Sequence, residues 1–174
     1  LVVVMKDRNK QIGMVPEMLQ RQRTALLYLD GMTKLETEND VTGATRQFEL
    51  ALKNDSVFLP AVFVLADCYL AVDSRRKAIK LLEKSFTLAP HADIAEMLQK
   101  LWGDNDGNTL ARIIRLTPKK SLVLKNVAYQ VIGDFAASKK LDGEAKRFGE
   151  LCDLTNAAFG WQCLDCKSLH DVWH

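Results

Sequence analysis

Two stretches of this chain repeat one another at an interval of 34 residues. Small and bulky residues recur in the same order: Ala44, Phe48, Ala51 and Ser56 are followed 34 positions later by Ala78, Leu82, Ser85 and Pro90. Ahead of them, the same interval relates Tyr28, Gly31, Met32 and Leu35 to Val62, Leu65, Ala66 and Tyr69. A fixed period of this length is typical of a unit of two helices that buries its apolar face only by stacking on a neighbouring unit.

Helical periodicity surrounds these repeats, and strand patterns are nearly absent. Apolar residues three and four apart predict helices over 16–36, 42–53, 59–72 and 74–90, and Pro16 suits a first helical turn. The chain is 48% apolar and has only 4 Pro and 9 Gly, which is compatible with a packed core. Cys68 and Cys152 lie inside helical patterns, so we expect them to be small core residues.

The pattern resembles the tetratricopeptide repeat (TPR), in which small residues let two helices approach and a bulky neighbour fills the adjoining hole. We therefore predict an all-α fold, a TPR-like solenoid of antiparallel helix pairs, over residues 1–158. The expected repeats are about 25–58, 59–92, a degenerate 93–124, and 125–158. A later copy is indicated by Tyr129, Gly133, Ala136, Ala145 and Cys152, with Phe148 one residue out of register. The alternative is a generic helical bundle.

The TPR resemblance implies a noncatalytic scaffold, because the first helices of stacked repeats form a concave surface for a peptide or partner helix. Repeat geometry places six residues on that surface: Leu29, Thr33 and Glu36 from one copy, and Phe63, Asp67 and Leu70 from the next. Apolar Phe63 and Leu70 beside the two carboxylates would suit a ligand with apolar anchors and a basic residue. In the alternative interpretation, these residues belong to the core or to neutral surface.

Several other functions find no support in the sequence. A Gly-rich phosphate loop, a nucleophile elbow and a Ser/His/Asp order are all absent, so we do not expect an enzyme. The 24 basic and 22 acidic residues give a net charge of +2 without a basic stripe, which argues against nucleic acid as a partner. The short basic clusters are interpreted as solvated helix ends: Arg75 to Lys77, Lys119 with Lys120, and Lys139 with Lys140.

A closer resemblance is carried by the segments 58–95 and 161–173. The Asp-x-x-Phe-x-Pro-Ala lead at Asp55, the "APHADIA" exit and the final "WQCLDCKSLHDVW" resemble the HemY-type TPR inner-membrane proteins of alphaproteobacteria. The resemblance runs from about Met18 onward. It implies the soluble part of a membrane-anchored protein associated with haem biosynthesis, on the cytoplasmic side of the bacterial inner membrane. The N-terminal membrane anchor of that family would precede this sequence.

The tail, residues 159–174, holds a C-x-x-C pair, Cys163 and Cys166, followed by His170 and His174. Tetrahedral zinc needs four ligands, and one such pair supplies two. The resemblance implies a zinc-ribbon-like module with two knuckles, of which this sequence contains the first. We expect a truncated, metal-free ribbon, with zinc in the full-length protein.

Other interpretations of the tail remain open. One is a compact metal site that uses all four Cys and His side chains, although the spacing between them is cramped for one ion. A redox dithiol would need a lowered thiolate pKa, and the strand–helix pattern typical of such sites does not precede the motif. The tail could also be disordered, or dock as a structural cap. Covalent c-type haem is excluded because Lys167 follows Cys166. The alternative function is a metal- or haem-handling carrier.

Overall fold

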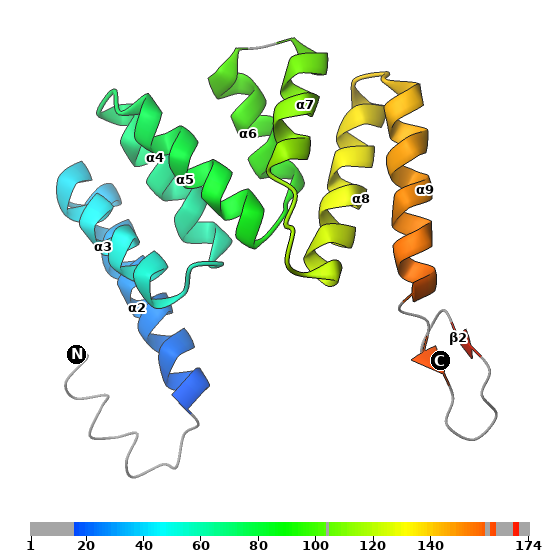
Figure 1. The fold of residues 1–174 in the computed structure, drawn as a ribbon. Helices are drawn as coiled ribbons and strands as arrows, with labels where there is room; N and C mark the ends of the chain where they lie inside the picture. Colours follow the sequence, from blue (N-terminus) through cyan, green and yellow to red (C-terminus); the bar gives the residue numbers. More distant parts are fainter. Residues whose placement is uncertain (1–15, 104, 159–160, 163–168, 171–174) are drawn as a thin grey trace. The chain divides into compact units, whose positions relative to one another are not determined.

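The computed structural model describes residues 16–103, 105–158, 161–162 and 169–170, and this part of the chain is almost entirely helical (Figure 1). Its helices are α2 (Pro16–Glu36), α3 (Val41–Asn54), α4 (Leu59–Ala71), α5 (Arg75–Leu88), α6 (Ala92–Trp102), α7 (Asp106–Arg115), α8 (Leu122–Ser138) and α9 (Asp142–Ala158). A two-residue antiparallel ladder joins β1 (Trp161–Gln162) to β2 (Leu169–His170). The all-α class predicted from the sequence is confirmed.

The helix bounds follow from local chemistry that is visible in the sequence. Pro16 begins α2 as predicted, since a proline in the first turn removes no helical hydrogen bond. Asp40 caps α3 by accepting a hydrogen bond of 2.8 Å from the Gly43 backbone N–H. The predicted limits of α3, α4 and α5 agree with the observed ones to within two residues.

Three of the turns between helices share a backbone feature. Asn39, Asp73 and Lys140 have φ values of 52°, 54° and 58°, in the left-handed region. Each lies two residues before the first residue of α3, α5 or α9, and Asn39 and Asp73 are 34 residues apart. Asn and Asp adopt this conformation more readily than other non-glycine residues. The turn that ends α6 differs, because Gly103 takes the left-handed position there directly after the helix.

The chain divides into two compact units, the first ending at Ser85 and the second beginning at Phe86. The core of unit 1 is built by α3 and α4. One cluster of buried residues in it consists of Ala44, Phe48, Ala51, Ala61, Leu65 and Cys68. Helix α2 adds Tyr28, whose ring centroid lies 5.7 Å from that of Phe48 and 5.5 Å from that of Phe58. Cys68 is a core residue, as predicted.

Helices α2 and α3 approach closely where Gly31 faces Phe48. A Cβ atom on Gly31 would stand 2.6 Å from Phe48 Cε1, which is closer than real Cβ atoms come to carbon. Phe48 itself is fully buried, so its ring has little room to move away. The bare backbone of Gly31 therefore lets the two helices meet.

Side-chain amides also join α2 to α3, at the end of the helix pair opposite the turn at 37–40. Asn54 Nδ2 donates to the Gln20 carbonyl oxygen at 2.8 Å and to Thr24 Oγ1 at 2.6 Å. Gln20 Nε2 donates in return to the Asn54 carbonyl oxygen at 2.6 Å. Thr24 is only 1% exposed and its hydroxyl also donates to the Gln20 carbonyl oxygen. These bonds are here called the amide clasp, and the one from Gln20 Nε2 satisfies the last carbonyl of α3, which has no partner within its own helix.

Helix α5 repeats the burial pattern of α3. Ala78 and Leu82 are fully buried and Ser85 is 4% exposed, just as Ala44, Phe48 and Ala51 are buried in α3. A hydrogen bond joins α4 to α3, because Tyr69 of α4 donates its hydroxyl hydrogen to Glu49 Oε1 of α3 at 2.7 Å. The pKa of Tyr69 is raised well above its usual value, first by burial and then by this hydrogen bond and the negative charge of Glu49.

Unit 2 contains α6 to α9 and the β1–β2 ladder. Its buried core comes from all four helices and includes Ile94, Leu98, Leu110, Ile113, Ala128, Ile132, Phe135, Ala136 and Phe148. Phe148 is 3% exposed and its ring centroid lies 5.7 Å from that of Tyr129. It is thus a core residue despite its shift from the repeat register. Cys152, predicted as a core residue, is only half-buried, and its Sγ lies 2.8 Å from Asn126 Oδ1.

No helix in the described part of the chain combines the length and the apolar character that crossing a bilayer requires.

Candidate partner-binding surface

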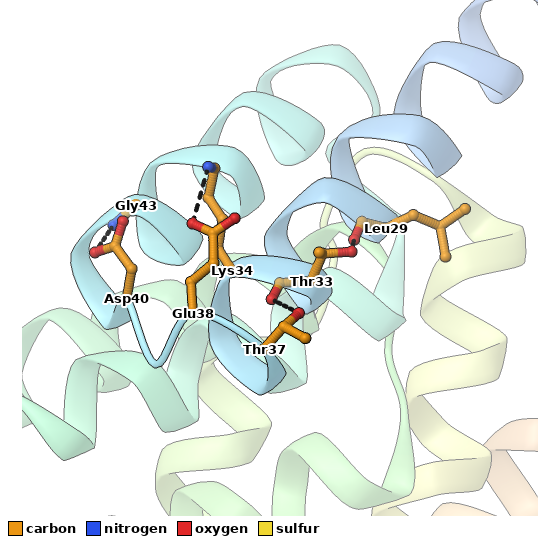
Figure 2. Close-up of polar contacts among 7 residues, drawn as sticks. All are labelled: Leu29, Thr33, Lys34, Thr37, Glu38, Asp40 and Gly43. Atoms are coloured by element: carbon orange, nitrogen blue, oxygen red, sulfur yellow. Dashed lines mark hydrogen bonds and ion pairs between the residues drawn. The ribbon is translucent and has the colours of Figure 1, made fainter.

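Three of the six predicted groove residues form one row along α2. Leu29, Thr33 and Glu36 are spaced by four and then three residues, which places them on one side of the helix. All three are exposed, and Leu29 is an apolar side chain with 58% of its surface accessible. Figure 2 shows Leu29 and Thr33 one turn apart, with the Leu29 side chain extended away from the helix. The structure therefore leaves this row accessible to a partner.

The Thr33 hydroxyl is already committed as a hydrogen-bond donor. Its Oγ1 donates to the Leu29 carbonyl oxygen at 2.9 Å, and Thr37 Oγ1 donates in the same way to the Thr33 carbonyl oxygen at 2.5 Å (Figure 2). A hydroxyl whose hydrogen is used this way still has acceptor lone pairs. Next to the exposed Glu36 carboxylate, the row thus offers acceptors and one apolar side chain.

The other three predicted groove residues form a matching row on α4. Asp67 is exposed, whereas Phe63 and Leu70 are half-buried rather than exposed. The difference has a physical reason: α4 is apolar along most of its surface, and it buries Ala61, Val62, Leu65, Ala66 and Cys68. A helix apolar nearly all round is covered on several sides. The α4 row therefore presents one carboxylate and only parts of two apolar side chains.

The two rows lie on separate helices of unit 1. Helix α2 is held against the unit 1 core by a neighbouring face, which includes Tyr28, Met32 and Leu35. Lys34, on another side of α2, pairs with Glu38 at 3.6 Å (Figure 2). The rows themselves carry the charges of Glu36 and Asp67 and no basic group. Their chemistry suits a ligand that presents a cation and an apolar side chain.

Cys68 lies beside the α4 row but has a structural role. Burial raises the pKa of its thiol; a hydrogen bond from Thr45 acts in the opposite direction, and the charge of Asp67 adds to the rise. The thiol is 2% exposed and stays protonated at neutral pH. A buried, protonated thiol is neither a nucleophile nor a metal ligand, so Cys68 contributes packing.

The predicted metal ligands of the tail fall largely outside the described residues. Cys163, Cys166 and His174 are not described, and His170 is known only as a backbone position in β2, opposite Trp161. Within the described part, no three His, Cys, Asp or Glu side chains gather as metal ligands would. The structure thus leaves the predicted half site of Cys163 and Cys166 untested.

Sequence reasoning missed a second surface, in unit 2. Arg115, Lys119, Lys125 and Arg147 line one cleft there, although Lys119 was interpreted as part of a solvated helix end. One signal was present in the sequence: the segment 116–125, which leads into α8, carries Lys119, Lys120 and Lys125 and no acidic residue.

Comparisons of the chain with protein-family models, with curated proteins and with solved structures give no match. Function is therefore inferred from the residues themselves.

Proposed function

We propose that this protein is a noncatalytic scaffold for protein–protein interactions, built as a TPR-like solenoid of antiparallel helix pairs. The observation that supports it is the shared register of its first helix pairs. Asn39 and Asp73 take the same left-handed conformation 34 residues apart, and Ala44 and Ala78 are both fully buried at the same interval. Repeats of this kind display their first helices to a ligand.

The partner in this proposal binds the α2 and α4 rows. It is a peptide or helix with a Lys or Arg that approaches Glu36 and Asp67 and an apolar side chain that packs on Leu29. The exposed carboxylates contribute mainly to specificity and to the rate of association, because exposed ion pairs stabilise a complex only modestly. The apolar contact with Leu29 provides most of the affinity.

Selection from a randomised peptide library displayed on phage tests this function. Peptides enriched on the native protein should contain a basic residue near an apolar one, and calorimetry should show them binding with one site per chain. The variant Glu36→Lys with Asp67→Lys should weaken them at least about tenfold. The matched control is Glu96→Lys with Glu150→Lys, which reverses two exposed charges in unit 2. Equal losses in both variants would contradict a specific surface.

On the resemblance to the HemY-type proteins, we further propose that the scaffold is held at the bacterial inner membrane and serves haem biosynthesis. Its partner would then be another protein of that process. Fractionation of the tagged full-length gene product tests the location: it should sediment with inner membranes and be released by detergent. Recovery in the soluble fraction would count against the membrane part of this proposal.

A second candidate function is a metal- or haem-handling carrier based on the tail. One observation favours it: the pairing of Gln162 with Leu169 brackets residues 163–168, the segment that contains Cys163 and Cys166. A short antiparallel pair on both sides of a C-x-x-C is compatible with a knuckle that offers two thiolates. Zinc bound by the purified protein and lost in Cys163→Ser, or a Soret shift on haem titration lost in His170→Ala, would support the carrier.

A further inference from the structure

Unit 2 contains a cleft whose charged lining is entirely basic. The cleft has a volume of about 390 Å³ and lies among the end of α7, the α7–α8 connection, α8 and α9. Four cationic side chains line it: Arg115, Lys119, Lys125 and Arg147. Its volume is at the lower end of the range for ligand sites, which suits a few side chains of a partner.

Aromatic rings form part of the cleft wall near two of these cations. Tyr129 and Phe148 both line it, and their ring centroids lie 5.7 Å apart. Lys125 Nζ stands 5.6 Å from the centre of the Tyr129 ring, and the Arg147 guanidinium 5.5 Å from the Phe148 ring. Lys125 and Arg147 are thus each held near the face of an aromatic ring. The cleft combines an apolar wall with a cationic rim.

The positive charge of the cleft is poorly compensated by the protein itself. Arg147 forms an ion pair with Glu144 at 3.3 Å, but the side chains are 63% and 41% exposed, so the pair is weak. Within the described part of the chain, no carboxylate forms an ion pair with Arg115, Lys119 or Lys125. These three cations are therefore available to an anionic ligand.

The start of α8 adds to this excess. Helices α6, α7 and α9 carry an acidic residue in the first turn, which stabilises the positive end of the helix dipole. Helix α8 has none, and it places Lys125 near that end, after Lys119 and Lys120. These lysines repel one another, and the positive end of the helix dipole repels them as well. An anion bound in the cleft would relieve this repulsion.

We propose that the cleft binds an acidic peptide segment that carries one apolar anchor side chain. The segment's carboxylates approach Arg115, Lys119 and Lys125, and its anchor packs on the accessible part of Tyr129, beside the buried Phe148. Two features favour a peptide over a nucleic acid or a lipid surface. The anchor of a peptide makes the hydrophobic contact that the apolar wall offers, and the net charge of the chain is only +2. This site is separate from the α2 and α4 rows, which take a ligand of the opposite charge.

Fluorescence anisotropy at low ionic strength tests this site with a labelled peptide of alternating Glu and Asp around one central Phe. The peptide should bind the native protein, and binding should weaken with added salt. The variant Arg115→Gln with Lys125→Gln should reduce affinity about tenfold. The matched control, Lys100→Gln with Lys146→Gln, removes two exposed charges elsewhere in unit 2 and should stay within about twofold. Circular dichroism confirms that both variants are folded.

Three further arms decide the class of ligand. A peptide with Ser in place of Phe should bind at least about fivefold more weakly, because it lacks the anchor. Single-stranded oligothymidylate and vesicles containing phosphatidylserine should bind more weakly than the Phe peptide. The proposal is overturned if the Phe peptide does not bind, if the Ser peptide binds equally well, or if either polyanion binds more tightly than the Phe peptide. It is also overturned if the control variant loses as much affinity as the cleft variant. Glu36→Lys with Asp67→Lys should leave this binding unchanged, so failure here is distinct from failure at the α2 and α4 rows.

Discussion

Phe48 lies so close to Gly31 that no side chain fits between the two helices that carry them. The pair Gly133 and Phe148 is related but looser, since a Cβ on Gly133 would stand 3.5 Å from Phe148 Cβ, an ordinary contact. Each glycine faces a phenylalanine of the following helix. The same substitution should therefore have opposite effects at the two sites.

We expect Gly31→Ala to destabilise the protein by about 1–3 kcal/mol, because the buried Phe48 ring must be displaced. Gly133→Ala should be neutral or stabilise by up to about 1 kcal/mol, because alanine lowers the entropy lost in forming a helix and meets no clash. Urea unfolding monitored by circular dichroism measures both. A stabilising Gly31→Ala would show that α2 and α3 can separate at no cost.

The burial of Ala44 and Ala78 in equivalent positions leads to a second prediction. Ala44→Leu and Ala78→Leu should each destabilise by about 1–3 kcal/mol, and by similar amounts, because each inserts a larger side chain into a filled core. Ala71→Leu, at an exposed site in α4, is the control and should change stability by less than about 0.5 kcal/mol. Very different values for Ala44 and Ala78 would argue against stacked repeats.

Half-burial of Phe63 and Leu70 leads to a third prediction. Phe63→Ala with Leu70→Ala should lower the melting temperature, because both side chains lose packing contacts with their surroundings. Leu29→Ala should leave it nearly unchanged, since Leu29 is largely exposed. Differential scanning calorimetry separates the two cases. Leu29 is therefore the better probe of partner binding, and an unchanged melting temperature in the double variant would restore Phe63 and Leu70 to that role.

The raised pKa of Tyr69 predicts how stability depends on alkaline pH. A group whose pKa is higher in the folded state stabilises that state below its unfolded pKa of about 10, and this contribution is lost as the pH rises above that value. Stability should therefore fall above about pH 10. Tyr69→Phe should weaken this dependence, and the difference between the ultraviolet titrations of the two proteins isolates the Tyr69 phenol. Ionisation of Tyr69 at or below its usual pKa would contradict its hydrogen bond to Glu49.

Much of unit 1 could be predicted from the sequence because its signals are local. Pro16 marks the start of α2, and the interval from Ala44 to Ala78 places two buried contacts correctly. Burial of Phe63 depends on what lies against α4 on several sides, and an ideal repeat does not specify this. The basic cleft depends on the path of the α7–α8 connection, which brings Lys119 near Arg147. Periodicity within helices carries no information on such a connection.

The amide clasp has a consequence for protein engineering. The pair α2–α3 is joined at one end by the exposed turn 37–40 and at the other by Gln20, Thr24 and Asn54. A foreign loop grafted into the turn would thus enter a helix pair that the amide clasp already holds together at its other end. The entropic cost of closing such a loop rises only slowly with its length.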